Sequence, residues 1–164
     1  MQEIYVENIK EVLRNKKRIE TELEIKLSNK GKNVFINGKP ENEFLALHVL
    51  EAVNAGFSVA NSLQLKDENI ILNTIFIKDI TKRNDLEIVR GRIIGREGST
   101  LKTLKHLTHC DFAMKVNTVG IIGDAEEIED AVQAIKSLIQ GSRQGRVYGR
   151  LERMRKERKS HDRH

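Results

Sequence analysis

The stretch from Arg90 to Cys110 constrains the fold of this chain more than any other part of it. It reads R-G-R-I-I-G-R-E-G-S-T-L-K-T-L-K-H-L-T-H-C, and its three glycines interrupt an otherwise helical pattern of apolar residues. A first helix should therefore end near Ile94 and pass through the residues G-R-E-G at 95–98 into a second helix. Ser99 or Thr100 could cap that second helix. The stretch predicts a helix, a G-x-x-G loop and another helix.

A glycine loop at the start of a helix is suited to binding an anion. Unpaired amides and the helix dipole favour negative charge there, and glycine lets a phosphate backbone come close. The spacing does not fit the G-x-G-x-x-G or G-x-x-x-x-G-K-[ST] loops that bind nucleotides. A bare G-x-x-G is often only a turn in a helical hairpin. With basic neighbours, two helices and two following strands, however, it makes the KH pattern, whose loop clamps about four backbone nucleotides.

The residues around the motif can supply the rest of such a module. Apolar periodicity predicts a strand over 74–80, a helix over 86–94, strands over 112–116 and 119–122, and a long helix from Asp124. Charge is unevenly divided between the two sides. Residues 82–105 hold seven basic and three acidic side chains, whereas 106–140 hold two and six. The basic side is therefore the loop side.

We predict a nucleic-acid groove between the first helix with its loop and the strand over 112–116. Ile93, Ile94 and Met114 would contact unstacked bases, although both isoleucines also suit the core and only one is expected to face the groove. Arg92, Arg96, Lys102 and Lys115 would lie near phosphates. The predicted RNA-binding residues are Arg90, Arg92, Ile93, Ile94, Gly95, Arg96, Glu97, Gly98, Ser99, Lys102, Met114, Lys115, Arg150 and Arg153.

The first half of the chain repeats part of the second at an offset of 85 residues. Val34, Ile36 and Gly38 fall on Val119, Ile121 and Gly123, and a helix predicted over 41–55 falls on the last helix of the second half. The two halves therefore look homologous. Upstream of this hairpin no glycine occurs before Gly31, so the first half should be a degenerate module without a G-x-x-G loop. The basic run over 14–18 then has a simple explanation as a solvated helix face.

Further elements of the first half follow from local patterns. We predict a strand over 4–6, a helix over 8–18, and a strand in which Leu23, Ile25 and Leu27 alternate with charged residues. Residues 58–72 carry regularly spaced apolar side chains and no Gly, Pro or Ser run. They should therefore join two halves that pack together, and should not act as a flexible tether.

The excess positive charge of the chain lies in its last 24 residues. The net charge is +5, and residues 141–164 hold nine basic and three acidic side chains. Val147, Leu151 and Met154 recur at spacings of four and three, which predicts a helix that lays this stripe on the second module and turns its arginines outward. The alternative is a solvated, disordered basic end. If the tail reaches RNA, Arg150 and Arg153 would contact phosphates.

Composition argues against several other classes of protein. A single cysteine excludes an internal disulfide framework, and no apolar run is long enough for a signal peptide or a membrane span, so we expect a cytoplasmic protein. His106, His109 and Cys110 make at most an incomplete zinc site. An acidic cluster over 124–130 is explained by its place at a helix start. We therefore expect no enzyme, no catalytic set, no metal and no cofactor.

Several matched segments together resemble one known family. These are G-R-I-I-G-R-E-G at 91–98, L-T-H-C at 107–110, N-T-V with I-I-G at 117–123, V-Y at 147–148 and L-E-R at 151–153. The chain from about Thr74 to Lys159, and more loosely the first half, is similar to the KH-domain factors of small-ribosomal-subunit assembly, the Dim-two or partner-of-Nob family, in their short archaeal form. It departs from that family in a shorter first module and in S-R-Q-G at 142–145 with Gly149.

The resemblance implies a fold and a role. The fold would be α+β, with two tandem type I KH-like modules, each a three-stranded antiparallel sheet with helices on one face, plus a basic C-terminal helix. The modules would span 1–72, without G-x-x-G, and 73–141, followed by the tail at 142–164. The family binds small-subunit rRNA near its 3′ end, beside a Nob-type endonuclease, and is associated with the alpha subunit of initiation factor two.

Two other functions remain open from the sequence. A general KH regulator of mRNA would bind single strands without preferring the rRNA 3′ end. A protein-docking scaffold in translation initiation would bind partners tightly and RNA weakly. In each case we expect a monomer.

Overall fold

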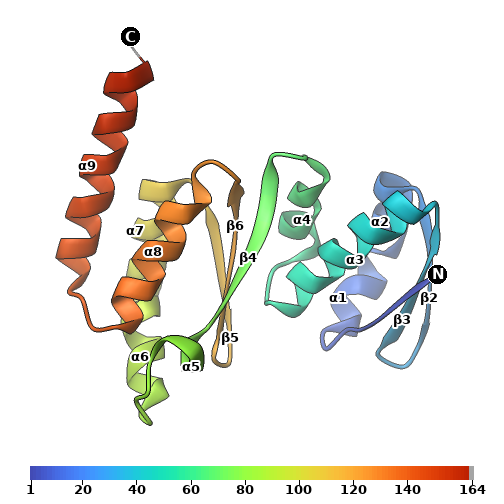
Figure 1. Cartoon of the computed structure of the whole chain (residues 1–164). Coiled ribbons are helices and arrows are strands. Elements are labelled where there is room, and N and C mark those ends of the chain that lie inside the picture. The colour runs from blue at the N-terminus through green and yellow to red at the C-terminus, as the bar shows by residue number, and fades with distance from the viewer. Residues whose placement is uncertain (163–164) are drawn as a thin grey trace. The chain divides into compact units, whose positions relative to one another are not determined.

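The computed structural model describes residues 1–162, which divide into two compact units (Figure 1). The first unit is Met1–Leu72, and the second begins at Asn73. Each holds a three-stranded sheet with helices packed against it. Within the described residues, no helix is both long enough and apolar enough to cross a membrane.

The first unit is built around the sheet β1-β3-β2, in which both outer strands run antiparallel to β3. Its elements are β1 (Gln2–Tyr5), α1 (Ile9–Arg14), α2 (Lys16–Leu23), β2 (Ile25–Lys30), β3 (Asn33–Gly38), α3 (Pro40–Asn54), α4 (Val59–Ser62) and a 3-10 turn at Leu63–Lys66. Alternation along the strands buries Ile25 and Leu27 of β2 and Val34 and Ile36 of β3. Helix α3 starts at Pro40, where the missing N–H of proline costs no helical hydrogen bond.

The structure corrects two predictions for this unit. The helix predicted over 8–18 is two helices that meet at Asn15, whose side-chain amide donates to the Glu11 carbonyl oxygen. The second of these, α2, continues to Leu23, so the strand begins only at Ile25. Glu24 separates them in a left-handed conformation, with φ of 55°. Alternation alone was misleading here, because Leu23 is buried equally well on the helix.

The second unit has the sheet order β4-β6-β5. Its elements are β4 (Ile70–Phe76), which starts just before the boundary, α5 (Ile77–Ile80), α6 (Leu86–Ile94), a 3-10 turn at Arg96–Gly98, α7 (Ser99–Thr108), β5 (Asp111–Lys115), β6 (Thr118–Asp124), α8 (Ile128–Ile139) and α9 (Gln144–Asp162). The α+β class is confirmed, with two three-stranded antiparallel sheets and a C-terminal helix.

Two element boundaries of this unit differ from prediction. The strand expected over 74–80 starts at Ile70 and ends at Phe76, and a helical turn, α5, takes the remaining residues. The helix expected from Asp124 starts at Ile128. Asp124 instead holds a turn, because its carboxylate accepts a hydrogen bond of 2.9 Å from the backbone N–H of Glu126.

The internal repeat is visible in the middle strand of each sheet. Val34 and Ile36 lie on β3, their counterparts Val119 and Ile121 lie on β6, and all four are buried. The paired glycines also have matching surroundings. A Cβ on Gly38 would come within 2.7 Å of Ile25, and a Cβ on Gly123 within 2.4 Å of the Cys110 sulfur. Since Ile25 and Cys110 are themselves 85 residues apart, the repeat extends to the start of each edge strand.

Helix α9 belongs to the second unit's core. It packs on α7 and α8, and Val147 and Leu151 are buried while Met154 is half-buried. Arg158 adds an ion pair with Asp130 of α8. The predicted amphipathic tail helix is thus confirmed up to Asp162, and Arg163 lies outside the described residues.

Candidate nucleic-acid interface

Two glycines shape the loop between α6 and α7. Gly95 ends α6 with φ of 77° and ψ of 171°, and its N–H donates to the Gly91 carbonyl oxygen at 2.8 Å. Gly98, with φ of 76°, is the residue before α7, and its N–H donates to the Gly95 carbonyl oxygen at 3.2 Å. Because side chains other than glycine rarely take such positive φ values, this geometry requires the G-x-x-G spacing.

Gly95 also meets a packing demand. A Cβ there would lie 2.2 Å from Oγ1 and 2.6 Å from the backbone nitrogen of Thr100. Thr100 is buried, and neither it nor Ser99 caps α7, which contradicts the predicted capping role. The first amides of α7 therefore have no side-chain cap, and the positive end of the helix lies next to the loop.

The two residues between these glycines are exposed. Glu97 is left-handed, with φ of 56°, and both Arg96 and Glu97 have exposed side chains. The loop therefore presents a charged tip directly before a helix N-terminus. Backbone amides, an arginine and open glycine backbone at one place suit a sugar-phosphate chain.

Gly91 is a residue that the sequence-based site did not include. It lies within α6 without a positive φ, and nothing is found within 4 Å of a Cβ built on it. Glycine in the interior of a helix costs about 1 kcal/mol relative to alanine. Neither backbone geometry nor packing within the chain explains this glycine. The signal in the sequence was its position four residues before Gly95, on the same side of the helix.

The two isoleucines of the motif have opposite surroundings. Ile93 has no exposed surface and belongs to the core, whereas Ile94 is 37% exposed. The inclusion of Ile93 as an RNA contact is therefore corrected, because its side chain has no surface to offer a ligand. Only Ile94 can face the groove, in line with the expectation that just one of the pair would do so.

Arg90 and Arg92 each hold a neighbouring segment in place. The guanidinium of Arg90 donates to the side-chain oxygen of Asn117 in the β5–β6 turn. Arg92 donates to the Ser142 carbonyl oxygen at 3.0 Å, and the side-chain amide of Gln144 donates to the Arg92 carbonyl oxygen at 3.4 Å. Both arginines are half-buried. They brace the elements that flank the loop.

The other predicted contacts come from three elements. Ser99 and Lys102 are exposed on α7, and Met114 and Lys115 are half-buried on β5, an outer strand of its sheet. Arg150 and Arg153 are exposed on α9, where they line a cavity with α8. The structure therefore does not bring these two arginines to the loop itself.

The histidine and cysteine residues at the end of α7 differ in exposure. His106 and His109 are exposed, while Cys110 is buried, and burial raises the pKa of its thiol. Nowhere in the described part of the chain do three His, Cys, Asp or Glu side chains gather as metal ligands would.

Comparison with known proteins finds KH-domain proteins, both by a family model and among sequence relatives. A family model described as the eukaryotic-type KH domain, KH-domain type I, for the second such domain of PNO1, matches residues 71–156. A KH domain-containing protein of Methanocaldococcus jannaschii is 31% identical over 147 residues, which is 85% of this chain and 65% of that protein. The pre-rRNA-processing protein PNO1 of Debaryomyces hansenii is 30% identical over 105 residues, 62% of this chain and 41% of that protein.

Solved structures are similar over nearly the whole chain. Dim2p from Pyrococcus horikoshii superimposes with a TM-score of 0.84 at 32% identity, covering 93% of this chain and 99% of that one. Dim2p in a complex with a/eIF2alpha and rRNA, from the same organism, gives 0.86 at 30% identity, with 95% and 94% covered. The chain spans between two fifths and two thirds of the length of the two sequence relatives described above.

Proposed function

Because the chain belongs to the type I KH-domain family of PNO1, we propose that it is an RNA-binding factor of ribosome biogenesis. The loop at 95–98 would bind single-stranded rRNA of the small subunit near the 3′ end of that rRNA. The observation that carries this proposal is the exposed Arg96–Glu97 tip, held between two glycines of positive φ at the uncapped start of α7. Such an arrangement is suited to a phosphate backbone.

The residues around the loop would contact different parts of the RNA. Arg96, Lys102 and Lys115 would lie near phosphates, and Ile94 with Met114 would contact bases. Gly91 would let the RNA come close to α6. Because Arg90 and Arg92 already bond to neighbouring segments, their main role would be to fix the walls of the groove.

The proposed partners follow the relatives. Dim2p of Pyrococcus horikoshii forms a complex with a/eIF2alpha and rRNA, and we propose that this chain does the same. Binding beside a Nob-type endonuclease stays a prediction. We further propose that the chain binds RNA without transforming it and acts in the cytoplasm.

The test is a double substitution of the loop tip, Arg96→Asp with Glu97→Asp. It replaces one positive charge by a negative one at the phosphate position, and aspartate tolerates the left-handed conformation of residue 97. Affinity for a single-stranded RNA from the small-subunit rRNA 3′ end, measured by fluorescence anisotropy, should fall by roughly a hundredfold or more. The melting temperature should change little, because both side chains are exposed.

A matched control makes the same two kinds of substitution, and so the same change in charge, on the first unit. Lys39→Asp with Glu41→Asp changes two exposed residues by the same amount and should leave RNA affinity nearly unchanged. Full affinity in a folded Arg96→Asp, Glu97→Asp variant would refute the proposed site.

A further inference from the structure

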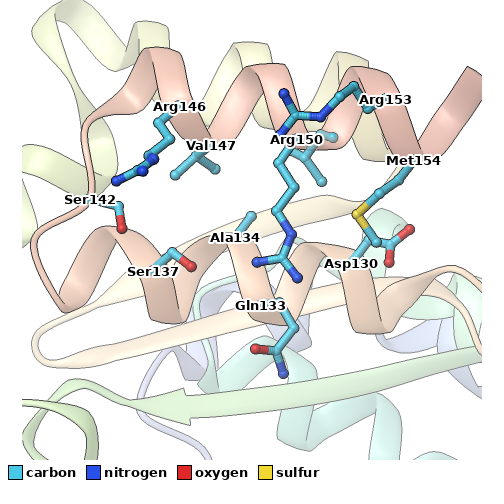
Figure 2. Close-up of a pocket in the computed structure, with 11 residues that line it drawn as sticks. Asp130, Gln133, Ala134, Ser137, Ser142, Arg146, Val147, Arg150, Arg153 and Met154 are labelled. Carbon is cyan, nitrogen blue, oxygen red and sulfur yellow. The ribbon is translucent and has the colours of Figure 1, made fainter.

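A cavity of about 270 Å³ lies between α8 and α9, on the side of α9 that carries Arg146 and Arg150 (Figure 2). It is lined by Asp130, Gln133, Ala134, Ser137, Ser142, Arg146, Val147, Arg150, Leu151, Arg153 and Met154. We call it the α8–α9 cleft. Its apolar floor, Val147 and Leu151, is buried in the core, so the accessible walls are mainly polar.

Arginines dominate one wall of the cleft. Arg146, Arg150 and Arg153 follow one another at spacings of four and three, so they form a stripe about 10 Å long on one face of α9. Figure 2 shows Arg146 directed toward Ser142 and Arg150 reaching across toward Gln133 of α8. Among the residues described by the structure, these guanidinium groups of Arg146 and Arg150 form no ion pair and no hydrogen bond. Two of the arginines that line the cleft therefore have no carboxylate partner.

The opposite wall offers groups that suit an anion. Ser137 and Ser142 contribute hydroxyl groups, while the amide of Gln133 is already bonded to Glu129 at 2.8 Å. The one carboxylate that lines the cleft, Asp130, is paired with Arg158. It is therefore neutralised and would repel an incoming phosphate only weakly.

The cleft starts next to the helix that leads into the loop. Ser142, at one end of the cleft, accepts the 3.0 Å hydrogen bond from Arg92, which lies three residues before Gly95 on α6. Gln144, the first residue of α9, also donates to the Arg92 carbonyl oxygen. Two hydrogen bonds therefore tie this end of the cleft to α6, the helix that leads into the loop.

We propose that the α8–α9 cleft is a second backbone-binding site, in which Arg146 and Arg150 take phosphates of the same RNA strand beyond the nucleotides held by the loop. This inference rests on the proposed function. The guanidinium groups of these arginines and the nearby serine hydroxyl groups can donate hydrogen bonds to phosphate oxygens. No aromatic residue lines the cleft, and Met154 is its one large apolar side chain that is not buried, so RNA is favoured over an acidic protein segment.

The experiment compares two single-stranded RNAs on the whole chain. One has about four nucleotides, enough for the loop, and the other about twelve nucleotides of the small-subunit rRNA 3′ end, enough to extend beyond it. Arg146→Gln with Arg150→Gln should weaken binding of the long RNA roughly tenfold and leave the short RNA unaffected. It should also reduce the log-log salt slope by about 1.4, since each contact on a single strand contributes about 0.7.

The control removes two positive charges from a part of α9 that does not line the cleft. Lys156 and Lys159 are exposed and do not line the cleft, so Lys156→Gln with Lys159→Gln should change the long RNA's affinity far less. Ser137→Asp offers a second route, because it puts a negative charge into the cleft while both arginines remain. It should weaken the long RNA in the same way.

Three results would overturn the proposal. The first is that the folded arginine variant keeps the affinity and the salt slope of the unchanged protein for the long RNA. The second is that the arginine and lysine variants lose equal amounts of affinity. The third is that the arginine variant binds RNA normally but no longer binds an acidic protein partner. The loop variant distinguishes this test from that of the proposed function. Substitution at Arg96 and Glu97 should weaken both RNAs, whereas the cleft variants should weaken only the long one.

Discussion

Gly91 and Gly95 are four positions apart but have different surroundings. Gly95 has a positive φ, and a side chain there would collide with buried Thr100. Gly91 is helical and has open space where a side chain would be. The same residue type therefore serves backbone geometry at one site and, under the proposed function, ligand access at the other.

Substituting each glycine by alanine should separate these two roles. Gly95→Ala should lower the free energy of unfolding by roughly 2–4 kcal/mol, because it combines a strained φ with a clash against Thr100. Gly91→Ala should raise it by up to about 1 kcal/mol through helix propensity, yet weaken RNA binding. Urea denaturation and RNA titration of both variants check this. A Gly95→Ala protein as stable as the unchanged chain would contradict the role of Gly95 in backbone geometry. A Gly91→Ala protein with full RNA affinity would contradict the role of Gly91 in ligand access.

At the scale of elements, the sequence predicted the parts that local chemistry determines. The helix over 86–94 and the loop after it were predicted because glycine spacing leaves few alternatives. The α1–α2 junction at Asn15 and the start of α8 were missed, since single side-chain hydrogen bonds decide them. The difference between Ile93 and Ile94, and the bond from Arg92 to Ser142, depend on how helices pack, which periodicity in one helix does not reveal.

Helix α9 is the element whose role is easiest to test. Leu151→Ala removes a buried side chain at the contact of α9 with α7 and α8, and should lower stability by about 2–3 kcal/mol. Glu152→Ala, at the adjacent exposed position, should change it by less than about 0.5 kcal/mol. Urea denaturation with hydrogen exchange of the α9 amides would show both. Equal stability of the two variants would mean that α9 contributes little to the core.

At the scale of the whole molecule, the two units share a plan but differ at the loop position. In the first unit, α1 and α2 meet at Asn15 with no glycine between them. Its basic run is also paired locally, since Arg14 contacts Glu11 and Arg18 contacts Glu22, each at 2.9 Å. The structure thus offers no open glycine backbone and no unpaired arginine pair at that position.

Residues 1–72 alone should therefore bind RNA negligibly. The fragment is slightly acidic and lacks the loop that would hold a phosphate backbone. Circular dichroism should first establish that the fragment is folded, and RNA titration at physiological salt should then show no saturation at micromolar protein. Micromolar affinity would mean that the first unit has an RNA site of another kind.

Helix α9 also has a consequence for how the protein is made. Val147 and Leu151 complete a core that begins at Ile75. The core of the second unit therefore combines residues that the ribosome adds early with residues that it adds much later. The first unit can fold while the ribosome is still adding the second, because domains generally fold as units, N-terminal first. The core of the second unit is complete only once Leu151 has emerged. A nascent chain stalled before that point would carry the glycine loop on an unfinished unit, and premature capture of RNA during translation would be disfavoured.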